Sequence, residues 1–214
     1  MREETRAYGA AGARSARTTS ARRSARRALI MGHAARLFHR QGYAATSMQQ
    51  IADAVGLSKP SLYYYVNSKD DLLFVMLEEV NDAGEEIVSE VMTMPVSPLQ
   101  QLAAYVRAWV GFNVDHLAEV AVYTRELNQL DRRRRRAIEQ GRERRFEFVT
   151  ALVRAAQAAG EVGPEPDADA VGHVTLGLVG YMHTWYQPRQ GPGGAELGDL
   201  MASMVIGGLS RRGG

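Results

Sequence analysis

Residues 47–66 carry the pattern that most narrows the possible folds of this chain: two short, capped helices joined by a glycine. Ser47 is followed three residues later by Gln50, which is the spacing of a capping box. Gly56 ends the helix that this box begins, and Ser58 is suited to cap the next one. Two short helices around a glycine-containing turn, with one helix before them, predict a three-helix helix-turn-helix unit.

An amphipathic helix precedes this pair. Ile30, Ala34, Leu37 and Phe38 recur at the spacing of one helical face, and the pattern stops at Gly42. Such an apolar face needs a partner, which the two short helices would supply. The residues that we expect to join those two helices in a small core are Ile51, Ala52, Val55, Leu57 and Leu62.

The rest of the chain is periodic like a helix and does not alternate convincingly with period two over the length of a strand. Ser68 begins a fourth helix, and further helices are expected at 98–117, 118–130, 132–159, 167–187 and 195–210. The predicted fold class is all-α, with a small N-terminal helix-turn-helix domain and a larger helical domain. The expected bounds are 1–24 for a flexible basic arm, 25–70 for the helix-turn-helix domain and 71–211 for the larger domain.

Positive charge is concentrated at the start of the chain. Residues 1–69 hold ten arginines and two lysines against three acids, a net charge of +9, whereas residues 70–214 hold fourteen arginines against twenty-one acids, a net charge of −7. A basic head on an acidic body is typical of a nucleic-acid-binding domain joined to a domain with another task. The alternative is a solvated basic tail, because eight of these arginines lie in residues 1–27.

Composition excludes several classes of protein. The chain has no cysteine, which excludes disulfides, thiolate metal sites and cysteine nucleophiles. No apolar run approaches the roughly 20 residues that cross a bilayer, and the N-terminus lacks the apolar segment of a secretory signal. We therefore expect a cytoplasmic protein without a membrane partner.

The second of the two short helices, which begins after Ser58, carries the side chains that could contact a ligand of the small domain. Tyr63, Tyr64 and Tyr65 are consecutive, and neighbours on a helix point about 100° apart, so at least one or two rings must face outward beside Lys59 and Ser61. Hydroxyl-tipped rings and a lysine are suited to grip phosphates and to touch base edges in a major groove. Double-stranded DNA is the expected partner. The alternative is an ordinary amphipathic hairpin with surface aromatics.

The segments Gly42–Ala52, Gly56–Lys59 and Leu62–Leu73 closely resemble the DNA-binding signature of the TetR family of transcription regulators. The resemblance implies a ligand-responsive regulator, most simply a repressor released from a palindromic operator. Val66 stands where the family usually has an aromatic residue, within the hydrophobic seam. The DNA contacts that the resemblance implies are Tyr63 and Lys69 on phosphates, Lys59, Ser61, Tyr64 and Tyr65 in the groove, and Ser47 and Gln49 from the preceding helix.

In this family the last two helices of each subunit form a four-helix dimer interface, which implies a homodimer here. The alternative is that the apolar stripes of these two helices, predicted at 167–187 and 195–210, belong to the core of one subunit. Both interpretations are compatible, because one side of a helix can face the core while another faces a partner. The expected interface residues are Val171, Val174, Leu178, Leu200 and Met204.

The helices between Pro98 and Pro188 carry more large apolar and aromatic residues than one inward stripe each requires. A mostly apolar cavity with a few polar groups is the usual form of a small-molecule site. The expected lining residues are Trp109, Phe112, Asn113, His116, Tyr123, Phe146, Val149, His173, Met182 and Trp185. The region also resembles, more loosely, TetR-family members that respond to acyl-CoA thioesters. A flat aromatic compound and a free fatty acid are the alternatives.

Arg132–Arg136, with Arg142, Arg144 and Arg145, form a dense basic cluster on one predicted helix. Five consecutive residues surround a helix, so they cannot form one binding face. The cluster is either solvated surface paired with nearby glutamates or a site for an anionic group, with Arg142 or Arg145 holding ligand phosphates at the mouth of the cavity. A partner protein or DNA is a third alternative.

Two other classes of function remain to be weighed. A helical enzyme would need a nucleophile with a base, paired carboxylates, a phosphate-binding loop or regularly spaced metal ligands, and the chain has none of these patterns. No histidine pair has metalloenzyme spacing, so neither a metal nor a cofactor is expected. An architectural DNA binder without a ligand is disfavoured, because the larger domain exceeds what dimerisation needs.

Overall fold

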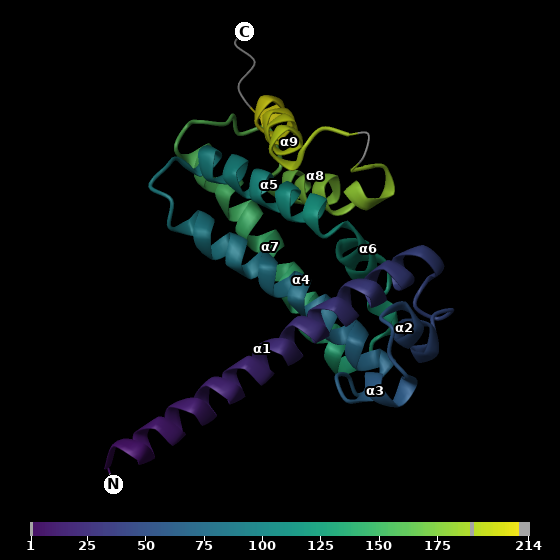
Figure 1. The fold of residues 1–214 in the computed structure, drawn as a ribbon. Helices are drawn as coiled ribbons and strands as arrows, with labels where there is room; N and C mark the ends of the chain where they lie inside the picture. The colour runs from purple at the N-terminus through teal and green to yellow at the C-terminus, as the bar shows by residue number, and fades with distance from the viewer. Residues whose placement is uncertain (1, 189–190, 210–214) are drawn as a thin grey trace. The chain divides into compact units, whose positions relative to one another are not determined.

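A computed structural model describes residues 2–188 and 191–209, with side chains from residue 22 onward. The described residues form helices joined by loops and contain no strand, which confirms the predicted all-α class (Figure 1). The chain divides into two compact units, residues 1–73 and 74–214, and the boundary falls inside the helix α4 (Lys69–Met92). The sequence placed this boundary at residue 70, and the predicted end of the second domain, residues 210–211, lies outside the described part of the chain.

The first unit contains α1 (Arg2–Gln41), α2 (Met48–Ala54), α3 (Lys59–Tyr63) and the start of α4. Its core is the predicted one, with only Leu57 partly exposed. Gly56 adopts a φ of 65° between α2 and α3, a conformation that side chains with a Cβ rarely adopt. The buried residues of this core include Ile30, Ala34, Leu37, Phe38, Ile51, Ala52, Val55 and Leu62.

Helix α1 begins far earlier than the sequence pattern indicated. We expected a helix from Ala25, because residues before it show no apolar periodicity, but α1 is continuous from Arg2. The segment is rich in alanine and arginine, and both residue types favour a helix without an apolar face. The mobility of the predicted arm stays a prediction.

The second unit is a helical bundle built on α5 (Pro98–Asp115). Helix α5 packs against α9, α7 and α8, and α7 packs against α8 (Figure 1). Within the described part of the chain, no helix combines the length and the hydropathy that a membrane crossing requires. The other elements of this unit are α6 (Leu117–Arg125), η1 (Leu127–Gln129), α7 (Arg132–Ala158), α8 (Ala168–Gly180), η2 (Met182–Thr184) and α9 (Gly194–Leu209).

Two predicted helices of this unit are shorter than expected. The helix predicted at 118–130 ends at Arg125 and is followed by the short 3₁₀ turn η1. The helix predicted at 167–187 ends at Gly180 and is followed by η2. Glycine weakens a helix, and α8 contains Gly177 and Gly180 in its last turn. Apolar periodicity continues through both breaks, so it could not reveal them.

Candidate functional site

Helix α3 presents an exposed polar edge. Lys59, Ser61, Tyr63 and Tyr64 are exposed, whereas Tyr65 is half-buried. Two of the three consecutive rings therefore face solvent, as their spacing on a helix requires. Leu62, between Ser61 and Tyr63 in sequence, is fully buried in the core of the first unit. The buried side of α3 thus fixes the helix while its other side stays available for a ligand.

Local capping fixes the ends of the two short helices. The Ser47 and Gln50 side chains complete the predicted capping box at the start of α2. The Ser58 hydroxyl accepts a hydrogen bond from the backbone N–H of Ser61 at 3.3 Å and caps α3. The predicted contact residues Ser47 and Gln49 are both exposed, and Gln49 also donates to Asp53 at 2.8 Å.

Arg23 of α1 lies against the exposed tyrosines. Its guanidinium carbon is 5.0 Å from the centre of the Tyr64 ring, and Nη2 donates to the Tyr64 carbonyl at 3.4 Å. The Tyr64 and Tyr65 rings meet edge to face with centres 5.2 Å apart. The Arg23 guanidinium is close enough to add positive charge to the polar edge of α3. The sequence did not indicate this contribution of Arg23.

Lys69 is engaged within the first unit. Its Nζ donates to the carbonyl oxygens of Tyr43 at 3.0 Å and of Thr46 at 2.9 Å, and it lies 4.3 Å from the centre of the Tyr43 ring. An ammonium has three donors, so two of them already hold the loop between α1 and α2. Lys69 therefore supports this loop. A substitution of Lys69 would therefore change the stability of the first unit together with any phosphate contact.

The second unit contains a partly open cavity of about 320 Å³ between α5, α6, α7 and α8. Its walls are mostly apolar and aromatic, with two arginines and a histidine among them. Three of the predicted ligand-binding residues, Trp109, Tyr123 and His173, line it. The full lining is Trp109, Val120, Tyr123, Thr124, Arg142, Arg145, His173, Leu176, Gly177, Gly180 and Tyr181.

A buried polar layer adjoins this cavity. Arg145 is buried, and its Nη1 donates to the Asn81 side-chain oxygen at 2.9 Å and to the Asn81 carbonyl at 3.3 Å. Its Nη2 donates to the Tyr123 hydroxyl. Burial raises the pKa of the Tyr105 hydroxyl, and the positive charge of Arg145 opposes this rise. The layer joins α4 to α6 and α7 through residues far apart in sequence.

Asn81 and Tyr105 were missed by sequence reasoning. Asn81 follows Leu77 by four residues, so it falls in the apolar stripe of α4, where a polar residue is unusual. This polar residue within the apolar stripe was the feature of the sequence that could have identified Asn81. Tyr105 carried no such signal, because its ring belongs to the buried face of α5 and its hydroxyl has no hydrogen-bond partner among the described residues.

The structure does not bring the other seven predicted ligand-binding residues into this cavity. Asn113, Val149 and Met182 are fully buried in the bundle, and Trp185 is exposed. The Phe112 ring stacks on Trp109 and His116, and Phe146 contacts His173. The prediction rested on the number of large residues in these helices, and that number does not indicate which helical faces meet. The residues outside the cavity lining are Phe112, Asn113, His116, Phe146, Val149, Met182 and Trp185.

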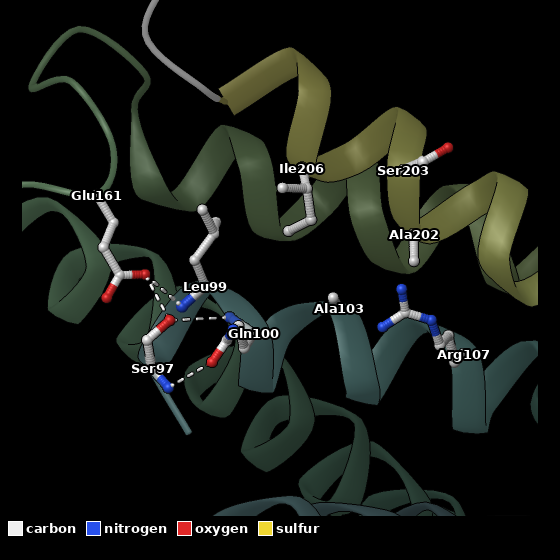
Figure 2. A pocket seen from close by; sticks show the side chains of 9 residues that line it. All are labelled: Ser97, Leu99, Gln100, Ala103, Arg107, Glu161, Ala202, Ser203 and Ile206. Carbon is white, nitrogen blue, oxygen red and sulfur yellow. Dashed lines mark hydrogen bonds between the residues drawn. The ribbon is translucent and has the colours of Figure 1, made fainter. Parts of the chain in front are cut away.

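A second hollow of about 580 Å³ lies between α5, α9 and the loop after α7 (Figure 2). Its polar groups already bind one another. The Glu161 carboxylate accepts from the Ser97 hydroxyl at 2.8 Å and from the Leu99 N–H at 3.1 Å, and thereby caps α5. Arg107 pairs with Asp199 at 2.6 Å. These groups stabilise helix contacts, so the aromatic cavity is the better candidate for a ligand.

The predicted dimer-interface residues lie on α8 and α9. Val174, Leu200 and Met204 are 67%, 52% and 60% exposed, whereas Val171 and Leu178 are partly buried. Val171, Val174 and Met204 line one groove of about 330 Å³, so α8 and α9 contribute to one apolar surface. Large exposed apolar patches are rare on monomeric proteins.

The arginine cluster of α7 separates into different environments. Arg132, Arg133, Arg136 and Arg144 are exposed, whereas Arg145 is buried. Arg142 is partly buried, donates from Nη2 to the Tyr123 carbonyl and lies 4.3 Å from the Tyr123 ring centre. The interpretation as solvated surface therefore fits the exposed arginines of the cluster and is wrong for Arg145.

Both units match family models of known proteins. Residues 30–76 match the family model described as bacterial regulatory proteins, tetR family, and residues 95–209 match tetracyclin repressor-like, C-terminal domain. The HTH-type transcriptional repressor KstR2 of Mycobacterium tuberculosis is 24% identical over 192 residues, 89% of this chain and 96% of KstR2. The HTH-type transcriptional regulator HbdR of Aromatoleum sp. is 29% identical over 161 residues, 75% of this chain and 68% of HbdR.

Solved structures agree with these matches. The structure of the ketosteroid transcriptional regulator KstR2 of Mycobacterium tuberculosis has a TM-score of 0.83 at 23% identity, covering 87% of this chain and 96% of that one. AibR in complex with isovaleryl coenzyme A and operator DNA has a TM-score of 0.74 at 27% identity, covering 85% and 98%. Because the model of the C-terminal domain alone spans more than half of the sequence, this chain belongs to the TetR family of bacterial transcription regulators.

Proposed function

We propose that this protein is a homodimeric repressor that binds a palindromic operator through α3 and is released by a small apolar or acyl-CoA-like effector. The observation that carries the DNA-binding part is the exposed edge of α3 on a buried helix-turn-helix core. In helix-turn-helix proteins the second helix of the motif enters the major groove. KstR2 is named a repressor, and AibR was solved with operator DNA.

In this proposal the exposed residues, together with the half-buried Tyr65, divide into two roles. Lys59, Ser61, Tyr64 and Tyr65 face base edges, where hydroxyl groups and rings distinguish sequences. Tyr63, with Ser47 and Gln49 from α2, binds sugar and phosphate and fixes the orientation of the helix. Lys69 contributes through the loop that it holds and through its remaining donor.

Replacing Tyr64 by alanine tests the proposed role in reading bases. The exposed ring is removed without opening the core, so folding should be retained. We expect affinity for the operator to fall about tenfold or more, as for the loss of one base contact, while affinity for random DNA changes much less. Fluorescence anisotropy with both DNAs at one salt concentration measures the difference.

Two further variants define this test. Tyr64→Phe keeps the ring and its contact with Arg23 but removes the hydroxyl, so it separates stacking from hydrogen bonding. Gln140→Ala alters an exposed residue of α7 and should leave both affinities unchanged. Equal losses of operator and random-DNA affinity in Tyr64→Ala would reduce Tyr64 to a backbone contact.

The cavity of the second unit supports the effector part of the proposal. Apolar and aromatic walls with a few polar groups suit a small organic ligand. AibR, which shares this fold, was solved with isovaleryl coenzyme A. A ligand releases DNA only if it binds the two states of the protein with different affinities, so occupancy alone is insufficient.

Titration of the protein–operator complex tests the effector class. A chain-length series of acyl-CoA thioesters is compared with the corresponding free acids and with uncharged aromatic compounds. We expect at least one thioester or acid to weaken operator binding about 5- to 150-fold, the usual range of such coupling. If uncharged aromatic compounds alone shift the affinity, the acyl-CoA-like class is wrong.

A further inference from the structure

We propose that the cavity binds an apolar molecule whose own anionic group, a carboxylate, enters the cavity and pairs with Arg145. This inference rests on the proposed function, because it concerns the effector of the same cavity. It adds the charge of that effector and the residue that recognises it. A free acid and a thioester with a second, terminal carboxylate both present this group.

The environment of Arg145 is the first argument. The residue is 3% exposed and lines the cavity. A guanidinium removed from water needs opposite charge nearby as well as hydrogen bonds. Its hydrogen-bond acceptors are the Asn81 side chain, the Asn81 carbonyl and the Tyr123 hydroxyl, all of which are neutral.

The carboxylate beside Arg145 compensates its charge incompletely. The Glu85 carboxylate lies 4.0 Å from Arg145 Nη1, beyond hydrogen-bond distance. It is partly exposed and binds Arg144 more closely, at 3.1 Å. One carboxylate therefore serves two guanidinium groups, and the buried one is the more distant.

The cavity lining is the second argument. Arg142 and Arg145 both face it, and no aspartate or glutamate occurs among the described residues that line it. The remaining walls are mostly apolar or aromatic, as at Trp109 and Leu176, and also include Thr124 and His173. An uncharged ligand would leave the buried guanidinium of Arg145 without an added negative charge. A carboxylate would supply that charge and form charge-assisted hydrogen bonds.

A pair of fluorescent probes tests this proposal. 8-Anilinonaphthalene-1-sulfonate and N-phenyl-1-naphthylamine share one aromatic framework, and the former alone carries an anionic group. The chain has two tryptophans, so Trp185→Phe leaves Trp109, in the cavity wall, as the sole donor for energy transfer to either probe. We expect the anionic probe to quench Trp109 and to bind about 10- to 100-fold more tightly than the neutral one.

Substitutions in the Trp185→Phe background assign this preference to Arg145. Arg145→Met should bring the two probe affinities within about threefold of each other, whereas Arg145→Lys, which keeps the charge, should retain much of the preference. Arg133→Met removes an exposed arginine from the same helix and should leave the preference unchanged. In competition, 4-phenylbutyrate should displace the anionic probe and its amide should not.

Three outcomes would overturn the proposal: equal affinity for both probes, a preference that survives Arg145→Met, or no quenching of Trp109. The probe measurement on the Trp185→Phe protein decides the question even if Arg145→Met does not fold. Operator binding by the same protein is measured in parallel. Operator binding without a probe preference rejects this inference alone, whereas a probe preference without operator binding rejects the proposed repressor function alone.

Discussion

Replacing Val174 and Met204 together by arginine is expected to produce monomers and to weaken operator binding at least about 100-fold. Both side chains are more than half exposed and line one apolar groove on α8 and α9. In a two-fold interface each substitution occurs twice, so four guanidinium groups would be buried without partners. A monomer binds one half-site and loses the gain from the second, which explains the size of the effect.

The matched control places the same charges on other exposed apolar residues. Met92→Arg with Met94→Arg changes side chains at the end of α4 and just after it, which are 65% and 38% exposed. This variant should remain dimeric and bind the operator as the natural chain does. Sedimentation equilibrium gives the mass of both proteins. A Val174/Met204 variant that stays dimeric would move the interface to another surface.

The elements of the first unit were predictable because their signals are local. The Ser47–Gln50 capping box and the Ser58 cap involve residues three positions apart, and both occur as predicted. Gly56 has the positive φ of the turn between the two helices, which glycine adopts without strain, so the residue type itself indicates the turn. The apolar stripe of α1 from Ile30 to Phe38 is buried as its spacing required.

The candidate cavity was predictable only in part, because it depends on contacts between distant segments. The Asn81–Arg145 hydrogen bond joins residues 64 positions apart, and the sequence between them does not specify this pairing. Trp109, Tyr123 and His173 were predicted from residue type and do line the cavity. Met182 and Trp185 were predicted by the same argument, but α8 ends at Gly180, and of the residues that follow it Tyr181 lines the cavity whereas Met182 and Trp185 do not.

Two glycines permit the close approach of α4 and α7 around the buried layer. A Cβ on Gly84 would lie 2.8 Å from Arg145 Cδ, and a Cβ on Gly141 would lie 2.1 Å from the Asn81 side-chain oxygen. Neither distance is tolerated between non-bonded atoms. The polar layer therefore requires glycine on both helices, although glycine lowers the stability of a helix by about 1 kcal/mol relative to alanine.

Gly141→Ala is accordingly expected to lower the free energy of unfolding by about 2–4 kcal/mol. The new methyl group must displace the Asn81 side chain, which would take its oxygen away from Arg145 and leave the buried charge with fewer hydrogen-bond partners. Urea denaturation at one fixed protein concentration measures the change. Gly111→Ala is the control: it lies in α5 with nothing within 4 Å of a new Cβ, so alanine should stabilise that helix by up to about 1 kcal/mol.

A double mutant separates the clash from a general weakness of α7. Asn81→Ala removes the atoms that the Gly141→Ala methyl group would meet, so the two substitutions together should destabilise the protein by less than the sum of their separate effects. Arg145 still loses its bond to the Asn81 side-chain oxygen in the double mutant and keeps only the backbone carbonyl at that position, so stability should not return to that of the natural chain. Strict additivity, or a Gly141→Ala protein as stable as Gly111→Ala, would show that α4 and α7 do not meet through this layer.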